Sequence, residues 1–160
     1  MATDIFAKIG DIKGESTDSA FKDQIELFSW SFGVSQTGSM AYGGGGGEGK
    51  ANFNDFNFMH RLDKASPNLM KACATGKHYP EALVTARKAG EGQKEYMVFK
   101  FTDVLITSVQ PSGSNGGDGV MESVSMQFAK VELEYKAQKP DGSLDAGVFF
   151  KYDLKANKSY

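Results

Sequence analysis

The sequence predicts a mainly β protein, a small bent β-barrel of two packed sheets with one short α-helix. Two observations favour the barrel: long runs alternate apolar and polar residues, and in three of them the alternation slips by one residue. Because strand side chains have a period of two, such a slip exchanges the buried face, as at a bulge or a sharp coil. A third observation, a single segment with helix start and stop signals, predicts the lone helix.

The first part of the chain contains two of the expected strands. Residues 3–9 mix apolar and polar positions and predict a short strand, and the polar residues 10–24 predict a long loop. Residues 25–34 predict a longer strand. Its apolar residues stand on odd positions up to Leu27 and on even positions from Phe28 onward. We therefore expect this strand to bend near its middle.

The later strands repeat this behaviour. In one run the apolar phase changes between Phe101 and Val104, and in the next it changes between Phe128 and Val131. The loop 111–119 is rich in glycine and serine and is expected to join these two strands as an antiparallel hairpin. The remaining strands are expected at residues 51–59, 81–88, 95–109, 120–136 and 148–154, followed by a loose tail at residues 156–160.

The helix is expected at residues 66–74. Ser66 stands where an N-cap is expected, and Pro67 occupies the first helical position, where its missing N–H costs nothing. Gly76 supplies a left-handed stop. The expected apolar face consists of Leu69, Met70 and Cys73. A helix this short is not stable alone, so we expect it to lie against the barrel.

Size and charge exclude several classes of protein. The 160 residues fit one domain, residues 1–160, and the net charge of −2 gives no electrostatic drive toward nucleic acid or an anionic membrane. No apolar run is long enough to span a membrane, and Met1–Phe6 does not begin a secretory signal. One cysteine permits no intrachain disulfide. We expect a protein made in the cytoplasm that does not insert into membranes.

The longest glycine run invites a phosphate-loop interpretation. Gly44, Gly49 and Lys50 fit G-x-x-x-x-G-K, but Ala51 replaces the hydroxyl that holds magnesium. No apolar strand leads into the run, and a strand-like segment rather than a helix follows it. A phosphate cradle needs that helix N-terminus, so we interpret the run as a flexible arm.

The remaining reactive residues form no catalytic or metal-binding pattern. His60 is expected in a solvated turn and His78 in a surface contact, and two histidines without a cysteine cluster do not make a zinc site. Cys73 is expected to be a small buried apolar residue. Glu132 and Glu134 are expected on the solvent-exposed face of a strand. We therefore expect no catalytic residues, no metal and no cofactor, and a protein that binds or assembles rather than an enzyme.

Several segments resemble the haemolysin-coregulated protein (Hcp) family. The resemblance begins with MATDIFAKIGDIKGES and continues through SWSFGVSQ at residues 29–36. It includes the glycine run, DKASPNLM at residues 63–70, CATGKHYP at residues 73–80 and ARKAG at residues 86–90. It covers essentially the whole chain and is densest over residues 1–96.

The resemblance implies a structural role in the type VI secretion system. Six subunits would form a ring, and stacked rings would form an inner tube with a fold related to phage tail-tube proteins. A contracting sheath would propel the tube, which carries a spike and holds small effectors in its lumen. The protein would leave the cytoplasm without a signal peptide. Ser31 would face the lumen. The contact loop toward neighbouring subunits would contain Ser39, Met40, Tyr42, Gly43, Gly44, Gly45, Gly46, Gly47 and Gly49.

An alternative is a small-ligand carrier, in which the barrel encloses a ligand and the helix acts as a lid. The aromatic content of 12% permits this, since ligand pockets are lined by aromatic and apolar side chains.

Overall fold

The computed structural model describes residues 2–37, 50–90 and 92–160. Over these residues the chain forms ten strands and one helix, and the protein is mainly β as predicted. The elements are β1 (Thr3–Ile9), β2 (Ile25–Ser31), β3 (Val34–Ser35), β4 (Asn52–Phe53), β5 (Phe56–Arg61), α1 (Ser66–Thr75), β6 (His78–Lys88), β7 (Glu95–Ser112), β8 (Met121–Gln138), β9 (Leu144–Asp153) and β10 (Lys158–Ser159).

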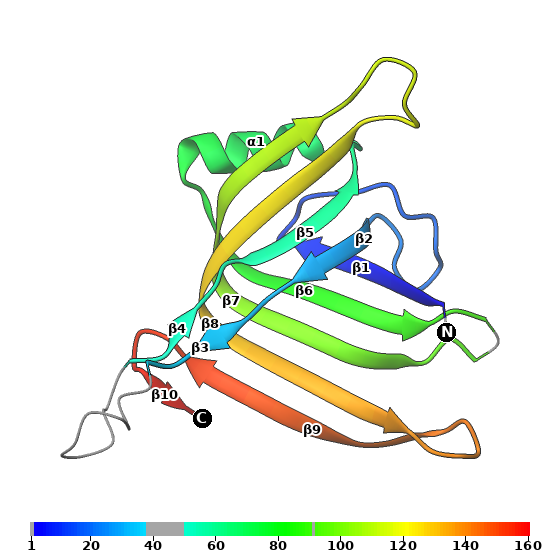
Figure 1. The fold of residues 1–160 in the computed structure, drawn as a ribbon, viewed down its shortest axis with the longest axis vertical. Helices are drawn as coiled ribbons and strands as arrows, with labels where there is room; N and C mark the ends of the chain where they lie inside the picture. Colours follow the sequence, from blue (N-terminus) through cyan, green and yellow to red (C-terminus); the bar gives the residue numbers. More distant parts are fainter. Residues whose placement is uncertain (1, 38–49, 91) are drawn as a thin grey trace.

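Six strands close a barrel in the order β8-β5-β2-β1-β6-β7 and back to β8 (Figure 1). β7 and β8 are long, and β8 pairs with β7 along nearly its whole length. The other edge of β8 pairs with β5 over residues 121–126 and with β9 over residues 130–138. The second half of β8 therefore leaves the barrel and, with β9 and β10, forms a sheet extension (Figure 1).

The predicted phase slips are present, and two of them face each other. Phe101 pairs with Val131 and Val104 pairs with Phe128, and all four side chains are buried. β7 and β8 thus exchange their buried faces at the same level, where Asp103 has a left-handed φ of 56°. Because of this double slip, the β7–β8 hairpin contributes one face to the core of the barrel and the other face to the sheet extension.

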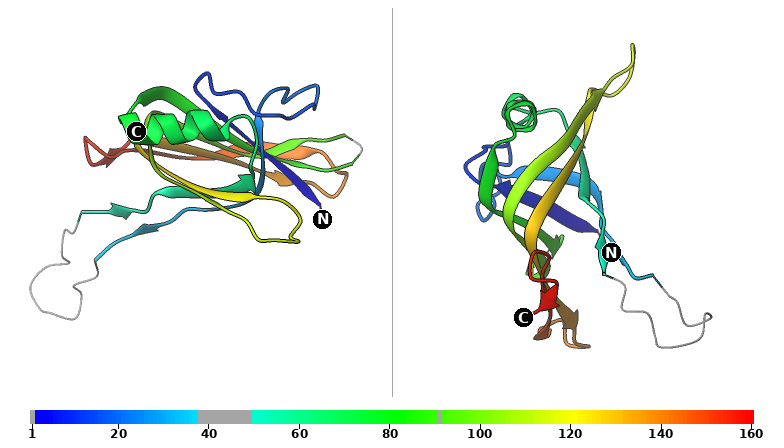
Figure 2. Two further views of the ribbon diagram at one scale, coloured as in Figure 1. Left: turned by 90° about the horizontal axis from the view of Figure 1, so that it is seen from above. Right: turned by 90° about the vertical axis from the view of Figure 1, so that its left-hand side faces the viewer.

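The slip in the β2 region is a bulge. The register of β2 against β5 shifts between Leu27 and Ser29, which leaves Phe28 exposed. The predicted strand at residues 25–34 is also interrupted at Phe32 and Gly33, which separate β2 from the short β3, and β3 pairs with β4 in a separate two-stranded ribbon. Figure 2 shows this β3–β4 ribbon projecting away from the barrel.

Aromatic side chains fill the barrel interior. Phe56, Phe99 and Phe101 pack with ring centroids 4.9–5.6 Å apart, and Phe128 lies 4.7 Å from Phe101. Trp30 stacks on Phe56 at 5.8 Å. Such offset and edge-on pairs stabilise a core beyond their area alone.

The helix forms where predicted, but its start differs. The N-cap is Ala65 rather than Ser66, and the Ser66 hydroxyl accepts a hydrogen bond from the Asp63 N–H. Because this hydroxyl is buried and turned back toward the preceding turn, it does not cap the helix. Pro67 and the left-handed Gly76, with φ 68°, act as expected. Met70 is exposed, and the buried face consists of Ser66, Leu69 and Ala72.

Two strand boundaries and the tail were also wrong. β6 begins at His78 rather than residue 81, because residues 78 and 79 already pair with β7. β9 begins at Leu144 rather than residue 148. The tail is not loose, since β10 pairs with β9 and the Tyr160 N–H donates to the Lys151 carbonyl at 3.2 Å. A two-residue strand carries too little pattern to be predicted from sequence.

Candidate functional site

The site begins with Ser31, the residue for which the family resemblance implied a channel-facing role. Ser31 is exposed at the end of β2 and pairs with Asn57 of β5, which in turn pairs with Ser125 of β8. The Ser125 hydroxyl donates to the Asn57 Oδ1, and the Asn57 side-chain amide donates to the Asp55 carbonyl at 3.2 Å. Three strands thus place short polar side chains in one row across the outer face of the sheet.

A second row runs parallel to the first. Ser29 pairs with Met59, and Met59 pairs with Ser123. On the far side of β8, the β7 residues Ser108 and Gln110 pair with Ser125 and Ser123. We call this surface the hydroxyl face; it consists of Ser29, Ser31, Asn57, Met59, Ser108, Gln110, Ser123 and Ser125.

The hydroxyl face follows from strand alternation. Trp30, Phe58 and Val124 stand between its members along the chain, and their side chains point into the core. The Ser-Trp-Ser and Ser-Val-Ser patterns are visible in the sequence. The sequence did not indicate that Asn57 and Ser125 lie beside Ser31, because β5 joins β2 to β8 only through long-range pairing.

None of the eight side chains of the hydroxyl face is charged. Along the chain, the ionisable residues on the same side of the sheet as Asn57 and Met59 are Asp55, just before β5, and Arg61, at its end, whereas His60 is buried in the core. The surface therefore offers weak hydrogen bonds and one methionine contact, and it has no charge that changes with pH.

The chemistry of nucleophilic catalysis is not assembled here. The Ser125 hydroxyl is turned to an amide, and the histidines point elsewhere. His78 is exposed and pairs with Asp103, with Nδ1 and Oδ1 3.0 Å apart. This contact holds the pKa of the Asp103 carboxyl below its ordinary value. Over residues 2–37, 50–90 and 92–160, no three His, Cys, Asp or Glu side chains are placed to hold a metal ion.

His60 lies in a different setting from the expected solvated turn. It belongs to β5, is completely buried, and lies 2.8 Å from the Glu122 Oε1 through its Nε2. Sequence reasoning missed it because the strand continues through His60 and Arg61 before turning. The single cysteine, Cys73, is partly buried against the core.

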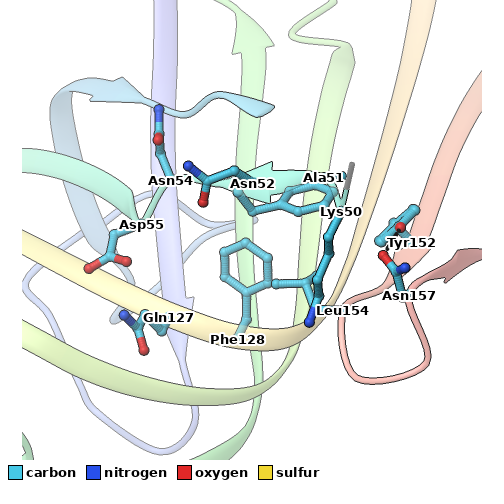
Figure 3. A pocket seen from close by; sticks show the side chains of 11 residues that line it. Lys50, Ala51, Asn52, Asn54, Asp55, Gln127, Phe128, Tyr152, Leu154 and Asn157 are labelled. Carbon is cyan, nitrogen blue, oxygen red and sulfur yellow. Dashed lines mark hydrogen bonds between the residues drawn. The ribbon is translucent and has the colours of Figure 1, made fainter. Parts of the chain in front are cut away.

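A pocket of about 270 Å³ lies where the β3–β4 ribbon meets β8 and the turn after β9 (Figure 3). Phe53, Phe128 and Tyr152 form its apolar lining, and Lys50 and Asn157 stand at its border. The Tyr152 hydroxyl donates to the Asn157 Oδ1 at 2.8 Å. The pocket lies at the base of the ribbon and outside the barrel interior.

The predicted contact loop falls outside the described residues. This applies to all of its members: Ser39, Met40, Tyr42, Gly43, Gly44, Gly45, Gly46, Gly47 and Gly49. The structure describes only the β3–β4 ribbon on either side of it. The strand β4, rather than a helix, follows Lys50, which is unlike the context of a phosphate loop.

Comparison with known proteins identifies the family. A family profile described as "Type VI secretion system effector, Hcp" matches residues 6–135. This chain belongs to the Hcp family. Protein hcp1 of Pseudomonas aeruginosa is 48% identical over 159 residues, which cover 98% of either chain. The type VI secretion assignment made from the sequence is therefore confirmed.

Solved Hcp structures share the fold. Hcp1 from Salmonella typhimurium is 40% identical, covers both chains completely and superimposes with a TM-score of 0.82. A type VI secretion system effector from Yersinia pestis is 36% identical, with a TM-score of 0.77 over 94% of this chain and 99% of its own. A type six secretion system protein at 28% identity reaches a TM-score of 0.94 over 99% and 100%.

The Hcp fold of this chain is a closed barrel with added strands and one short helix, as the sequence predicted. Where the structure describes the chain, no helix has the length and apolar character needed to cross a membrane.

Proposed function

We propose that this Hcp protein is a building block of the type VI secretion tube. Six copies form a ring, rings stack into a tube, and the hydroxyl face lines its channel with Ser31 among the lining residues. Small effectors are held in the channel. The tube is assembled in the cytoplasm, carries the spike, and is expelled by the contractile sheath.

The observation that carries this proposal is the chemistry of the hydroxyl face. A channel must hold cargo during assembly and release it afterwards, so strong or charge-selective contacts are unfavourable. Ser31, Asn57 and Ser125 offer neutral hydrogen-bonding groups in one row. In a ring each such group recurs once per subunit, so individually weak contacts add up by multivalency.

The closed barrel supports a role as a rigid wall element. The short β3–β4 ribbon extends from the barrel after β2, which carries Ser31, and its connecting loop is proposed to reach a neighbouring subunit (Figure 2). The members of that loop are Ser39, Met40, Tyr42 and the glycines from Gly43 to Gly49, excluding Glu48.

A substitution at Ser31 tests the channel assignment. Ser31→Tyr is expected to leave the six-subunit rings intact. It should reduce the amount of a co-expressed small effector that co-purifies with them, because six tyrosine side chains narrow the channel. Ser19→Tyr is the matched control, since Ser19 is an exposed serine outside the hydroxyl face. Loss of assembly in Ser31→Tyr would place Ser31 in a subunit contact instead. Equal effector retention in both variants would refute the channel-facing role.

The ligand-carrier alternative is less well supported. A carrier encloses its ligand in a cavity within the barrel, whereas Phe56, Phe99, Phe101 and Phe128 occupy that space here. The side of α1 that would close such a cavity is packed onto the core through Leu69 and Ala72. A small molecule that co-purifies with monomeric protein would support the ligand-carrier function instead.

A further inference from the structure

The loop between β7 and β8 contains a residue pair whose backbone can react with its own side chain. Residues 113–119 are GSNGGDG, and Asn115 is the one asparagine of six in the chain that a glycine follows. The amide carbon of an asparagine can be attacked by the backbone nitrogen of the next residue. A side chain on that next residue obstructs the attack, and glycine has none, so an Asn-Gly pair favours it.

The structure leaves this pair uncovered. Residues 113–119 are all exposed, and the loop projects beyond the barrel (Figure 1). The pairing of β7 with β8 ends at Ser112 and Met121, so the loop lies outside the ladder. Within residues 113–119 the one backbone hydrogen bond runs from the Gly117 N–H to the Ser114 carbonyl at 3.2 Å. The nitrogen of Gly116 is therefore not tied down by a backbone hydrogen bond in this loop.

The turn around Asn115 also permits the rotation that the attack needs. Gly116 has a φ of 81°, which is typical of the third residue of a type II turn. A turn closed by a single hydrogen bond at the surface opens at little cost in free energy. Asn115 can then rotate about its backbone and side-chain bonds until its amide carbon meets the nitrogen of Gly116.

The pair Asp141-Gly142 could react through the same ring closure, but it is held. Its carboxylate accepts hydrogen bonds from the Ser143 N–H at 2.9 Å and from the Ser143 hydroxyl at 2.6 Å. These bonds hold the pKa of the Asp141 carboxyl below its ordinary value. The Gly142 N–H donates to the Lys139 carbonyl at 2.9 Å. Because a carboxylate has to be protonated before it can lose water, this pair is expected to be unreactive.

The pair Asp118-Gly119 is held by Arg61. The Asp118 carbonyl accepts a hydrogen bond from the Arg61 Nη1 at 2.8 Å. The same nitrogen would lie 3.2 Å from a Cβ at Gly119. Arg61 thus contacts the backbone on both sides of the peptide bond that would have to rotate. Of the three pairs in which glycine follows Asn or Asp, only Asn115-Gly116 is left to react.

We propose that Asn115 is a site of spontaneous deamidation in the folded protein. The Gly116 nitrogen forms a bond to the Asn115 Cγ, the bond from Cγ to Nδ2 breaks, and ammonia leaves with the proton from the Gly116 N–H. The product is a cyclic succinimide. Water opens it at either carbonyl, which gives aspartate or isoaspartate at this position. Water is the only co-reactant, and the inference does not depend on the proposed ring.

The modification changes the tip of the β7–β8 hairpin without touching the core. Either product replaces a neutral amide by a carboxylate, which adds one negative charge to a chain whose net charge is −2. Isoaspartate also inserts one methylene group into the backbone. A surface loop outside the strand ladder tolerates such an insertion. The protein is therefore expected to exist in two charge forms whose proportion changes with its age.

Ageing the purified full-length protein at mildly alkaline pH and physiological temperature tests the inference. The buffer is prepared in water enriched in heavy oxygen, because opening of the succinimide adds one oxygen from water to every residue that has reacted. Peptide mapping by mass spectrometry is expected to show the label at Asn115 as two isomeric products, with isoaspartate in excess. Asn157, in an exposed turn but followed by lysine, is the internal control and should remain unlabelled.

A matched variant and a stability measurement complete the test. Asn115→Gln is expected to abolish the label at this position, because its longer side chain closes a less favourable ring. The converted form, separated by anion exchange, should melt at the temperature of the unconverted form. An unlabelled Asn115 in the folded protein, when a synthetic peptide of residues 112–118 is labelled, would overturn the inference. Equal labelling at Asp141, or a lower melting temperature after conversion, would also contradict it.

Discussion

His60 and Glu122 face each other inside the barrel, with the imidazole Nε2 2.8 Å from the carboxylate Oε1. They are directly opposed residues of β5 and β8, and neither side chain is exposed. Asp63 lies on the other side of the ring, 3.8 Å from Nδ1. Within the described part of the chain, Nδ1 of His60 and Oε2 of Glu122 have no hydrogen-bond partner. The pair is thus a buried ionic contact with two unsatisfied atoms.

This pair predicts a pH-dependent stability. Burial alone would lower the pKa of His60, but the carboxylates of Asp63 and Glu122 outweigh it and raise that pKa above its ordinary value. A raised folded-state pKa contributes stability that is complete below the unfolded pKa of about 6.5 and is lost as pH rises through the folded value. The free energy of unfolding, measured in urea, is therefore expected to fall as pH rises above about 6.5.

Two variants test whether the His60–Glu122 pair causes this pH dependence. Glu122→Gln is expected to reduce it and to destabilise the fold by about 3–5 kcal/mol, because it removes one partner of a buried pair. The control is His78→Gln, since the exposed His78 is the one other histidine in the sequence. His78→Gln should retain the wild-type fall in the free energy of unfolding above about pH 6.5. Identical pH profiles for wild type and Glu122→Gln would contradict the role of the pair.

The side-chain contacts of Arg87 fix the long loop between β1 and β2 to the barrel. Its guanidinium lies 5.1 Å from the Phe6 ring centroid and 5.2 Å from that of Phe21, and it forms ion pairs with Asp4 and Asp18. Arg87→Lys keeps the charge but loses the planar fork and the stacking, so we expect a loss of about 1–3 kcal/mol and faster hydrogen exchange in the loop. Lys88→Arg, at the neighbouring and more exposed position, is the control. Unchanged exchange in Arg87→Lys would show that the loop is held by other contacts.

The ion pair between Arg87 and Asp18 also makes the stability of the fold depend on pH in the acid range. The hydrogen bond from Arg87 holds the pKa of the Asp18 carboxyl below its ordinary value. A lowered folded-state pKa contributes stability above the unfolded value of about 3.9, and this stability is lost as pH falls through the folded one. The Arg87→Lys variant is expected to lose part of this acid dependence.

Two left-handed glycines predict unequal costs of substitution by alanine. At Gly10, with φ 51°, a Cβ would overlap the Tyr79 ring, whereas at Gly76, with φ 68°, it would meet nothing within 4 Å. Gly76→Ala is expected to cost about 1–2 kcal/mol from backbone strain alone. Gly10→Ala should cost more, because Tyr79 is buried and has to move. Equal melting temperatures for the two variants would contradict this geometry.

Much of the fold could be predicted from local pattern. The slip between Phe101 and Val104 and its counterpart between Phe128 and Val131 are visible in the alternation of each strand, and Pro67 and Gly76 mark the helix. The opposition of the two slips could not be predicted, because it depends on register. The prediction that Ser66 caps the helix was wrong for a similar reason. Its hydroxyl accepts a hydrogen bond from the Asp63 N–H in the preceding turn instead of one from the first turn of the helix.

The candidate site was predicted only at Ser31, and that through family resemblance. Its neighbours Asn57 and Ser125 come from strands far apart in the sequence, and pairing alone brings them together. His60 was placed in a turn because a polar residue beside Arg61 and Asp63 resembles a solvated segment. Its burial depends on Glu122, a partner 62 residues away.

Electron microscopy of the purified wild-type protein tests the central claim most directly. The account predicts closed rings of six subunits around an open channel. In a three-dimensional reconstruction, Ser31, Asn57 and Ser125 are expected on the channel wall. A monodisperse monomer at high protein concentration, or rings whose hydroxyl face points outward, would contradict it.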